Sequence, residues 1–567
     1  MFMNDQKNML LAIALTFVVL LGFDYLVMRP QREAAMEKTP AAGSPLETPA
    51  ATTALIEDVV PRETALAASP RVFIETPRLK GSIALRGGLI DDLTLIGYRQ
   101  TVEPDSPPVV LLNPKGAENA YYAAFGWLAR AEFGLETPGE GTIWETGDRL
   151  LTPGNPVTLS WQGPKGLSFE RRIAVDENYL FTITDTVRNA GETPVLLAPY
   201  GLINRRGEPA VKGFAVMHEG PLGVFENGLE EKTYKDIRKN GTFSAKSVGG
   251  WLGMTDKYWL TALVPEQEVP FNARFTRKPE GAGAYQVDYR EEEIVVPAGG
   301  EKSVTSRLFA GAKEVDVIER YETTENIRLF DRAIDWGWFI FLTKPIFYLL
   351  DLLYGVTGSF AIAILLLTVI VKLVFLPLAN KSYVSMSHLK AVQPKMKALQ
   401  ERYKDDRARL QQEMMELYKK EKINPLAGCL PMLVQIPVFF ALYKVLFVTI
   451  EMRHQPGLFW IDDLSAADPL LVTNLFGLLP FTPPGFLAIG LWPVIMGVTQ
   501  FLQMRLNPSA GDPMQQRILS AMPFVFIFIM ASFPAGLVMY WTWNTILSGL
   551  QQWIIMKRHG AFAPSKS

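Results

Sequence analysis

Long apolar runs lie at both ends of the chain, and short alternating runs fill the stretch between them. Residues 9–23 are almost unbroken apolar and the run resumes at 25–28 after Asp24, so about 20 residues are available to cross a hydrocarbon layer. Apolar runs of this kind return only after residue 358, at 359–379, 430–450, about 486–502 and 518–556. The last run is about twice one span and has Phe533-Pro-Ala-Gly536 at its middle, so we divide it into two helices. The pattern predicts a polytopic α-helical membrane protein with six transmembrane helices.

A different period fills residues 71–312. Short β-branched and aromatic stretches there lie between Gly, Pro, Asn and Asp turns. In the segment 179–187, Tyr179, Phe181, Ile183 and Val187 alternate with Thr and Asp, which is the period of a half-buried strand. Helical repeats are absent from this stretch, and the spacing of its turns predicts a large β-sandwich.

Charge is distributed unevenly along the chain. Residues 30–358 carry 35 Lys and Arg against 45 Asp and Glu, whereas the remainder carries 21 against 13. The loop 381–422 has eleven basic and six acidic residues, and the loop 451–485 has one Arg and four acidic residues. Under the positive-inside rule the first loop is cytoplasmic and the second is outside. Both termini are then expected in the cytoplasm, and the acidic β domain is expected on the outer side of the membrane.

These observations divide the chain into six segments. We expect a transmembrane signal anchor at 1–28, a flexible linker at 29–70, a β-sandwich domain at 71–325, an interfacial amphipathic helix at 326–358, a five-helix membrane core at 359–558 and a cytoplasmic tail at 559–567. A cleaved signal peptide is the alternative to the anchor. A helix packed on the β domain is the alternative to the interfacial helix, whose tryptophans favour the membrane interface.

The basic loop 381–422 carries apolar residues at helical spacing on both sides of Asp405-Asp406. These are Met386, Leu389, Met396 and Leu399 in the first arm and Leu410, Met414 and Leu417 in the second. The pattern predicts a charged helical hairpin in the cytoplasm. Such a hairpin could contact ribosomal RNA or a nascent chain, and a plainly solvated surface is an equally good interpretation.

Polar residues interrupt three of the predicted spans. Lys372 lies within its span, where a charge costs at least about 2.5 to 3.5 kcal/mol, and Thr368 is one turn earlier on the same face. Gln435 is a second polar group at membrane depth, flanked by prolines. In the last span a polar stripe recurs every three or four residues, at Tyr540, Asn544, Ser548 and Gln551 or Gln552. Snorkelling of Lys372 and helix–helix hydrogen bonding are the structural alternatives, but together the three faces favour a hydrated cavity.

The chain lacks the residues that several classes of function require. The chain has one cysteine, Cys429, and four histidines. We find no catalytic cluster of carboxylates, metal-ligand spacing or nucleophile elbow in residues 71–312, and no phosphate-binding loop, HExxH motif or dinucleotide fingerprint anywhere in the chain. We therefore expect no metal, no cofactor and no enzymatic activity, and we interpret the β domain as a docking or spacing domain.

Six segments carry a resemblance to a known family. They are 371–378 (VKLVFLPL), 393–395 (QPK), 422–429 (KINPLAGC), 431–437 (PMLVQIP), 512–516 (DPMQQ) and 533–537 (FPAGL). They resemble the signature segments of the YidC family of membrane protein insertases, over about residues 325–558. The anchor and the large β domain resemble the Gram-negative branch, which implies a β-supersandwich in the periplasm and a location in the bacterial inner membrane.

The resemblance also implies how the membrane core works. It implies a monomeric insertase with a hydrophilic groove that is open to the cytoplasm and to lipid and holds a positive charge. That charge is usually arginine in the family and is Lys372 here, which keeps the charge without the planar five-donor fork. Thr368 and Tyr540 match groove residues that touch substrate. The hairpin and the tail match regions that recruit nascent membrane proteins, the ribosome or the Sec translocon.

Taken together, the sequence predicts an insertase whose groove residues are Lys372, Thr368, Gln435, Tyr540, Asn544 and Ser548. Its partners are expected to be nascent membrane proteins, the lipid bilayer, the ribosome and the Sec translocon. Two alternatives use the same features differently: a solute transporter that uses the polar stripe, and a membrane-anchored periplasmic protein that acts on carbohydrate. A transporter predicts inverted repeats, which the sequence does not show.

Overall fold

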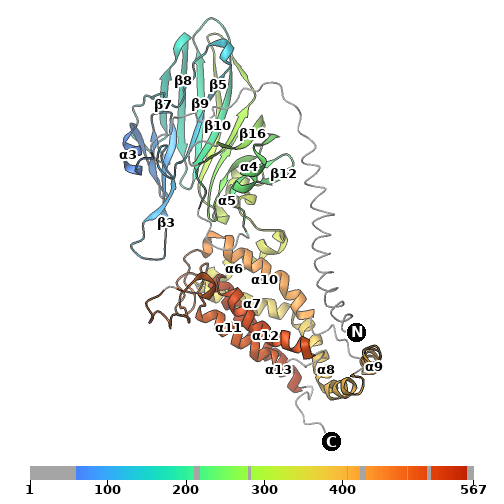
Figure 1. Ribbon diagram of the computed structural model, residues 1–567. Coiled ribbons are helices and arrows are strands. Elements are labelled where there is room, and N and C mark those ends of the chain that lie inside the picture. Colours follow the sequence, from blue (N-terminus) through green and yellow to red (C-terminus); the bar gives the residue numbers. More distant parts are fainter. Residues whose placement is uncertain are drawn as a thin grey trace. The chain divides into compact units, whose positions relative to one another are not determined.

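The computed structural model describes residues 59–209, 217–278, 283–404, 406–421, 430–481, 483–506 and 513–558 (Figure 1). The predicted anchor at 1–28, most of the linker at 29–70, the segment 422–429 and the tail at 559–567 lie outside the described residues. The first of the six predicted spans is therefore an expectation that the structure does not describe.

Residues 71–312 form two β-sheets. The larger sheet has eleven strands in the order β13-β16-β17-β10-β5-β3-β2-β1-β6, with β18 beside β10 and β4 beside β3. Its strands are β1 Arg71–Glu75, β2 Leu79–Ala84, β3 Leu89–Arg99, β4 Pro108–Leu112, β5 Tyr121–Ala129, β6 Leu150–Leu151, β10 Val195–Arg206, β13 Phe243–Val248, β16 Pro270–Lys278, β17 Ala284–Glu291 and β18 Ile294–Val296.

The smaller sheet has eight strands in the order β12-β11-β14-β15-β19-β9-β8-β7. They are β7 Val157–Gln162, β8 Leu167–Val175, β9 Leu180–Asn189, β11 Gly220–Phe225, β12 Gly228–Glu231, β14 Trp251–Thr255, β15 Trp259–Val264 and β19 Glu301–Ala312. Apart from the parallel pair β1 and β6, neighbouring strands run antiparallel throughout both sheets.

The two sheets bury their apolar faces in one shared core. Along β9 the buried side chains Phe181, Ile183 and Val187 alternate with partly exposed threonines, as the period of two predicts. The Tyr289 hydroxyl of β17 and the Ser306 hydroxyl of β19 lie 2.7 Å apart and so join the two sheets by a hydrogen bond inside this core. The predicted β-sandwich is confirmed.

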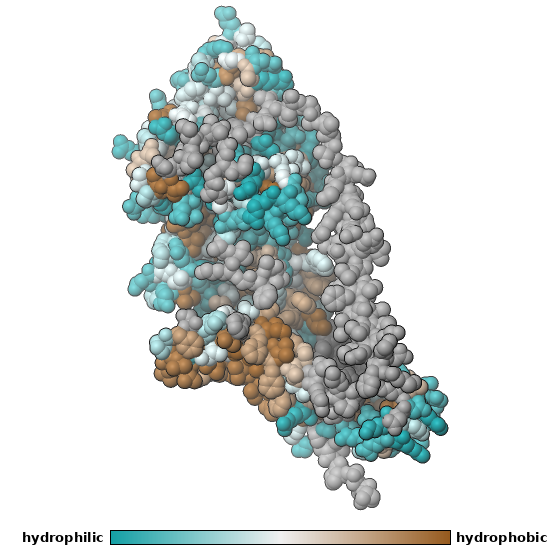
Figure 2. Space-filling view, in the orientation of Figure 1, coloured by the Kyte–Doolittle hydropathy of each residue, from teal (hydrophilic) through white to brown (hydrophobic). Residues whose placement is uncertain are grey.

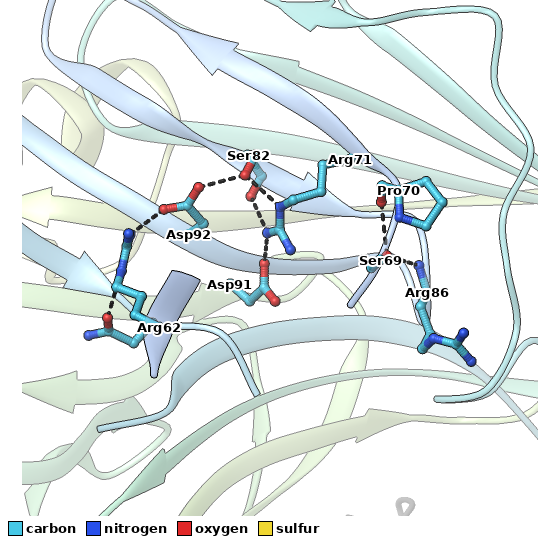
Figure 3. Close-up of polar contacts among 9 residues, drawn as sticks. Arg62, Ser69, Pro70, Arg71, Ser82, Arg86, Asp91 and Asp92 are labelled. Carbon is cyan, nitrogen blue, oxygen red and sulfur yellow. Dashed lines mark hydrogen bonds and ion pairs between the residues drawn. The ribbon is translucent and has the colours of Figure 1, made fainter. Parts of the chain in front are cut away.

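The ordered β domain begins before residue 71. Helix α3 (Arg62–Ala67) lies within the predicted linker, and Arg62 binds the Asn113 side chain at 3.0 Å and pairs with Asp92 (Figure 3). Next to it Arg71 pairs with Asp91, and the Ser82 hydroxyl donates to Asp92 at 2.5 Å. The linker prediction is wrong for α3. Arg62 binds the buried carboxylate of Asp92, and the composition of the stretch does not indicate this tertiary contact.

Helices make up most of the chain after residue 312. They are α5 Val315–Thr324, α6 Ile340–Thr357, α7 Phe360–Val374, α8 Leu376–Arg402, α9 Arg407–Lys420, α10 Leu430–Val448, α11 Leu491–Met504, α12 Pro513–Met530 and α13 Ala535–Arg558, with short 3₁₀ turns at η4 Phe330–Ala333, η6 Ile450–Met452 and η7 Gly485–Leu487. The β domain adds α4 Tyr234–Asn240, η2 Ala131–Phe133 and η3 Pro164–Gly166.

Five of these helices occupy the five predicted spans after residue 358. They are α7, α10, α11, α12 and α13, and the break between α12 and α13 falls at the predicted turn. By length and composition, α6 is the one described helix that could cross a membrane unaided, and α7 with α8 is a second candidate if that bent pair is one span. Apolar side chains dominate the surface of this helical part, whereas hydrophilic residues cover much of the β domain and of the α8–α9 hairpin (Figure 2).

The predicted helix at 326–358 is wrong in its first half, because α6 begins only at Ile340. Positive φ angles at Asn326, Leu329 and Gly337 are incompatible with a continuous helix there. Phe330 and Trp336 are buried, and the Phe330 ring lies 5.4 Å from that of Trp251 in the β domain. The first half is thus packed on the β domain, as in the alternative interpretation, but as an irregular segment with one 3₁₀ turn instead of the helix that this alternative expected.

The predicted span 359–379 is broken within its last turn. Helix α7 ends at Val374, and α8 starts at Leu376 with a bend of 69°. Pro377 lies in the first turn of α8, a position where its missing N–H is tolerated and where it cannot continue the preceding helix. Lys372 therefore lies in the last turn of α7 rather than in the middle of a span.

Helices α8 and α9 form a hairpin within the stretch where the sequence predicts one, 381–422, but its first arm begins earlier, at Leu376. Its two arms meet through Leu389, Val392 and Met396 on α8 and Met414, Leu417 and Tyr418 on α9. Asp406 caps α9 by accepting a hydrogen bond from the Arg409 amide at 3.1 Å.

Polar contacts join the β domain to the residues around α10. Lys444 of α10 pairs with Asp335 at 2.8 Å. Glu451, in η6, accepts a hydrogen bond from the Val315 amide at the start of α5 at 2.8 Å. Burial raises the pKa of Glu451 to about 7.

Candidate membrane insertion site

Lys372 is held at the end of a helix by the geometry of the α7–α8 bend. The amide of Phe375 closes α7 onto the carbonyls of Val371 and Leu373. Carbonyl groups at a helix C-terminus carry partial negative charge, so a cation in the last turn is favoured there. The break that Pro377 imposes thus provides a place at which an ammonium group is tolerated among apolar side chains.

The ammonium of Lys372 reaches across to α13. Its Nζ donates to the Ser548 hydroxyl at 2.6 Å, and that hydroxyl donates to the Asn544 carbonyl at 2.6 Å. Within the part of the chain that the structure describes, no carboxylate pairs with Lys372. A hydroxyl satisfies one of three donors and leaves the charge without a counter-ion.

A second polar contact links α10 to the same helix. The amide Nε2 of Gln435 donates to the hydroxyl of Tyr540, which is 1% exposed. Tyr540 and Ser548 are eight residues apart on α13, which corresponds to about 12 Å along a helix axis. The predicted polar stripe therefore receives one side chain from α7 and one from α10.

Lys372 and Gln435 line one pocket. Its volume is about 30 Å³, which is room for one or two water molecules. The remaining lining comes from Val371, Phe375, Leu378, Ala379 and Tyr383. The pocket lies where α7, the start of α8 and α10 approach each other, so three helices supply a small polar recess among apolar side chains.

Thr368 and Asn544 occupy different places from those expected. Thr368 is 1% exposed, its hydroxyl donates to the Ile364 carbonyl of its own helix at 2.7 Å, and it does not line the pocket. Asn544 is buried on α13 between Tyr540 and Ser548, and its Oδ1 has no hydrogen-bond partner among the described residues. A buried acceptor without a partner is destabilising, so this amide is held there by the surrounding fold.

Two residues at the site were missed in the sequence. Tyr383 lines the pocket, and Asn380 accepts a hydrogen bond from Gln551 of α13 at 3.0 Å. Both lie in α8: Tyr383 falls in the stretch assigned to the cytoplasmic hairpin, and Asn380 falls between that stretch and the predicted span. Their spacing of three residues, one turn after Leu376, was the available signal, because it puts both on one face of a helix that starts at the bend.

Comparison with known proteins identifies the family. The model described as "YidC periplasmic domain" matches residues 71–349, and the model described as "60Kd inner membrane protein" matches residues 352–561. The chain is 50% identical to "Membrane protein insertase YidC" of Methylorubrum extorquens (strain PA1), over 98% of this chain and 96% of that protein. The chain belongs to the YidC family of membrane protein insertases.

Two further relatives support this family assignment. A YidC insertase of Beijerinckia indica subsp. indica is 50% identical, and one of Bradyrhizobium diazoefficiens is 48% identical, each over 98% of this chain. The solved structure "Active YidC insertase crystal structure with the first transmembrane domain resolved" is similar at 16% identity and a TM-score of 0.36, over 86% of this chain and 95% of that one.

Family membership settles the class of function. The chain is a membrane protein insertase of the bacterial inner membrane and not an enzyme, with a β-rich periplasmic domain and a polytopic membrane core. Its substrates are membrane proteins. This family assignment replaces the solute transporter and the carbohydrate-acting protein that the sequence left as alternatives.

Proposed function

We propose that the polar residues of α7, α10 and α13 form the surface on which the hydrophilic flank of an incoming membrane protein rests during insertion. Lys372 carries this proposal, because it is a half-buried charge held by one hydroxyl. Its two remaining donors can bind a carbonyl or carboxylate of the substrate. Each polar group shielded from hydrocarbon lowers the barrier to translocation, and several kcal/mol are available in this way.

Apolar surface next to the pocket supports sideways release into lipid. Leu373 and Val374, directly after Lys372, are 61% and 68% exposed, and Ile436, directly after Gln435, is 44% exposed. A segment that leaves the polar recess therefore meets apolar side chains within a residue or two. We propose that the hydrophilic flank passes by the recess while the apolar segment moves past these side chains into the bilayer.

The hairpin α8–α9 is the proposed contact for the ribosome and the nascent chain. Most of its charged side chains are exposed, and basic residues outnumber acidic ones in the loop 381–422. A positive surface of this kind favours binding to phosphate groups of RNA. The Sec translocon is proposed as a partner on the grounds of the resemblance alone.

Site-specific photocrosslinking tests the substrate path. A photoreactive amino acid at Leu378, in the pocket lining, should crosslink to a ribosome-bound nascent chain of a single-span membrane protein. The same probe at Val525 of α12, which is 48% exposed, is the matched control and should crosslink mainly to lipid. Equal crosslinking of the nascent chain from both positions would refute a path through the pocket.

A further inference from the structure

The extracytoplasmic segment between α10 and α11 exposes an unusual amount of apolar surface. No Asp, Glu, Lys or Arg occurs between Asp468 and Arg505. Six large apolar side chains before α11 are exposed by 38% to 82%, and we call them the apolar loop: Leu475, Phe476, Leu478, Leu479, Phe481 and Leu487. An exposed apolar cluster of this kind marks a binding surface more often than chance.

The base of the apolar loop is closed by backbone hydrogen bonds. The Val472 amide donates to the Ile489 carbonyl at 2.8 Å, and the Leu491 amide donates to the Leu470 carbonyl at 3.0 Å. The tip is closed as well, because the amides of Phe476, Gly477 and Leu479 all find acceptors within residues 471–474. Backbone amides near the tip are thus satisfied internally, which lowers the free energy required to move them out of water.

Asp468 fixes this base to the first turn of α11. Its carboxylate accepts from the Leu470 amide at 2.9 Å, from the Trp492 amide at 2.7 Å and from the Trp460 indole at 2.9 Å. Trp460 and Trp492 lie with their rings 5.8 Å apart. Tryptophans gather at the level of the lipid headgroups, so this pair indicates where the base meets the membrane surface.

We infer that the apolar loop is inserted into the outer leaflet of the bilayer at the level between the headgroups and the acyl chains. Lipid is the occupant that fits, because the loop is continuous with membrane helix α11, lacks charge and keeps its tip backbone bonded. An irregular loop is not stable in the hydrocarbon centre, so the expected depth is shallow. The loop thereby gives the periplasmic end of α11 a second attachment to the bilayer.

Depth-dependent fluorescence quenching tests this inference in the full chain. In a Cys429→Ala background, Leu478→Cys is labelled with an environment-sensitive dye and reconstituted into phosphatidylethanolamine and phosphatidylglycerol vesicles. Val295→Cys in β18 is the control, since it is also apolar and 52% exposed. We expect quenching of the Leu478 label by lipids with a nitroxide near the headgroup, weaker quenching by a deep nitroxide, and at least twofold less quenching by aqueous iodide than at Val295.

Two outcomes would overturn the inference. Iodide quenching equal to that at Val295, without lipid quenching, would show that the loop lies in water. A blue-shifted label that neither lipid nitroxides nor iodide quench would show that protein, such as a second copy of the chain, covers the loop. Gly490→Ala provides a further check, because a Cβ at this position would collide with Asp468, release the base and reduce lipid quenching at Leu478.

Discussion

A buried cation, Arg171, and a half-buried cation, Lys372, have opposite surroundings in this protein. Arg171 of the β domain is 1% exposed, binds both oxygens of Asp185 at 2.6 and 2.9 Å, donates to the Phe125 carbonyl at 2.6 Å and lies over the Trp144 ring. Lys372 of the membrane core donates to Ser548 and borders a pocket, without a carboxylate among the described residues. The guanidinium of Arg171 thus has a carboxylate, a carbonyl and an aromatic ring as partners. The ammonium of Lys372 has one hydroxyl partner and retains two donors for another group.

We propose that this difference separates a charge that stabilises the fold, Arg171, from a charge that acts in insertion, Lys372. A buried guanidinium with a bidentate carboxylate has a planar fork whose donors are already occupied. We propose that a half-buried ammonium beside a recess can bind a substrate group at little loss, because only one of its three donors is bonded to a described residue. The comparison predicts that changes around Arg171 affect folding and that changes around Lys372 affect insertion.

The largest effect is expected from Asp185→Ala. It leaves Arg171 buried without a counter-charge, which should destabilise the β domain by about 3–5 kcal/mol. Pulse proteolysis of the full chain in detergent, over a urea series, measures the loss. Arg188→Ala is the control: this arginine and its partner Glu301 are 58% and 60% exposed, and loss of such a pair should cost about 0–1 kcal/mol. Equal effects of the two changes would contradict the comparison.

Lys372→Ala should have the next largest effect, on insertion rather than on stability. We expect a roughly tenfold lower rate for a single-span substrate with a charged translocated flank, equivalent to about 1.4 kcal/mol in the barrier. Lys372→Arg should retain most of the rate, because charge and hydration are both kept. Insertion into proteoliposomes measures both variants. If Lys372→Ala inserted this substrate at the wild-type rate, the charge would have no role in the insertion of that substrate.

Glu451 has surroundings intermediate between those of Arg171 and Lys372. Its buried carboxylate accepts a hydrogen bond from the Val315 amide, and no cation pairs with it in the described part of the chain. Burial raises its pKa from 4.5 to about 7, with smaller contributions from Glu314 and Asp316. A raised carboxyl pKa gives stability that is complete below pH 4.5 and is lost as the pH rises through 7. Thermal unfolding between pH 5 and 8 should therefore show a steeper loss for wild type than for Glu451→Gln. Parallel curves would contradict this assignment.

The sequence predicted those features that depend on local pattern. The strand period in β9, the break before α13 and the contacts of Met396 with the α9 arm all follow from spacing and turn residues. The early end of α7 was missed, although Pro377 was visible, because hydropathy continues across the break. The start of α6 at Ile340 was missed because the burial of Phe330 against Trp251 is a tertiary contact.

At the site, the sequence predicted residue types but not their partners. It placed Lys372, Gln435, Tyr540 and Ser548 on polar faces, and the structure brings them together in two pairs. It could not predict that Thr368 bonds its own backbone, because a threonine hydroxyl in a helix can face either the i−4 carbonyl or a neighbour. The way in which helices pair decides which partner such a hydroxyl takes. Residue spacing within one helix carries no information about that pairing.

The smallest effect is expected at Asn544, whose Oδ1 has no partner among the described residues. If this amide serves a hydrated path beside Lys372, Asn544→Leu should slow substrates with charged translocated flanks by about threefold, equivalent to about 0.7 kcal/mol, and leave nearly neutral flanks unchanged. If it serves helix packing instead, Asn544→Leu should change thermal stability and alter all substrates alike. Insertion of two substrates that differ only in flank charge, measured beside the melting temperature, separates these results. Because leucine replaces an unsatisfied buried acceptor by an apolar group of similar size, unchanged or raised stability with selective slowing of the charged substrate is the expected pair of observations. A lower melting temperature with uniform slowing would assign Asn544 to packing and would confine the polar path to Lys372, Ser548, Gln435 and Tyr540.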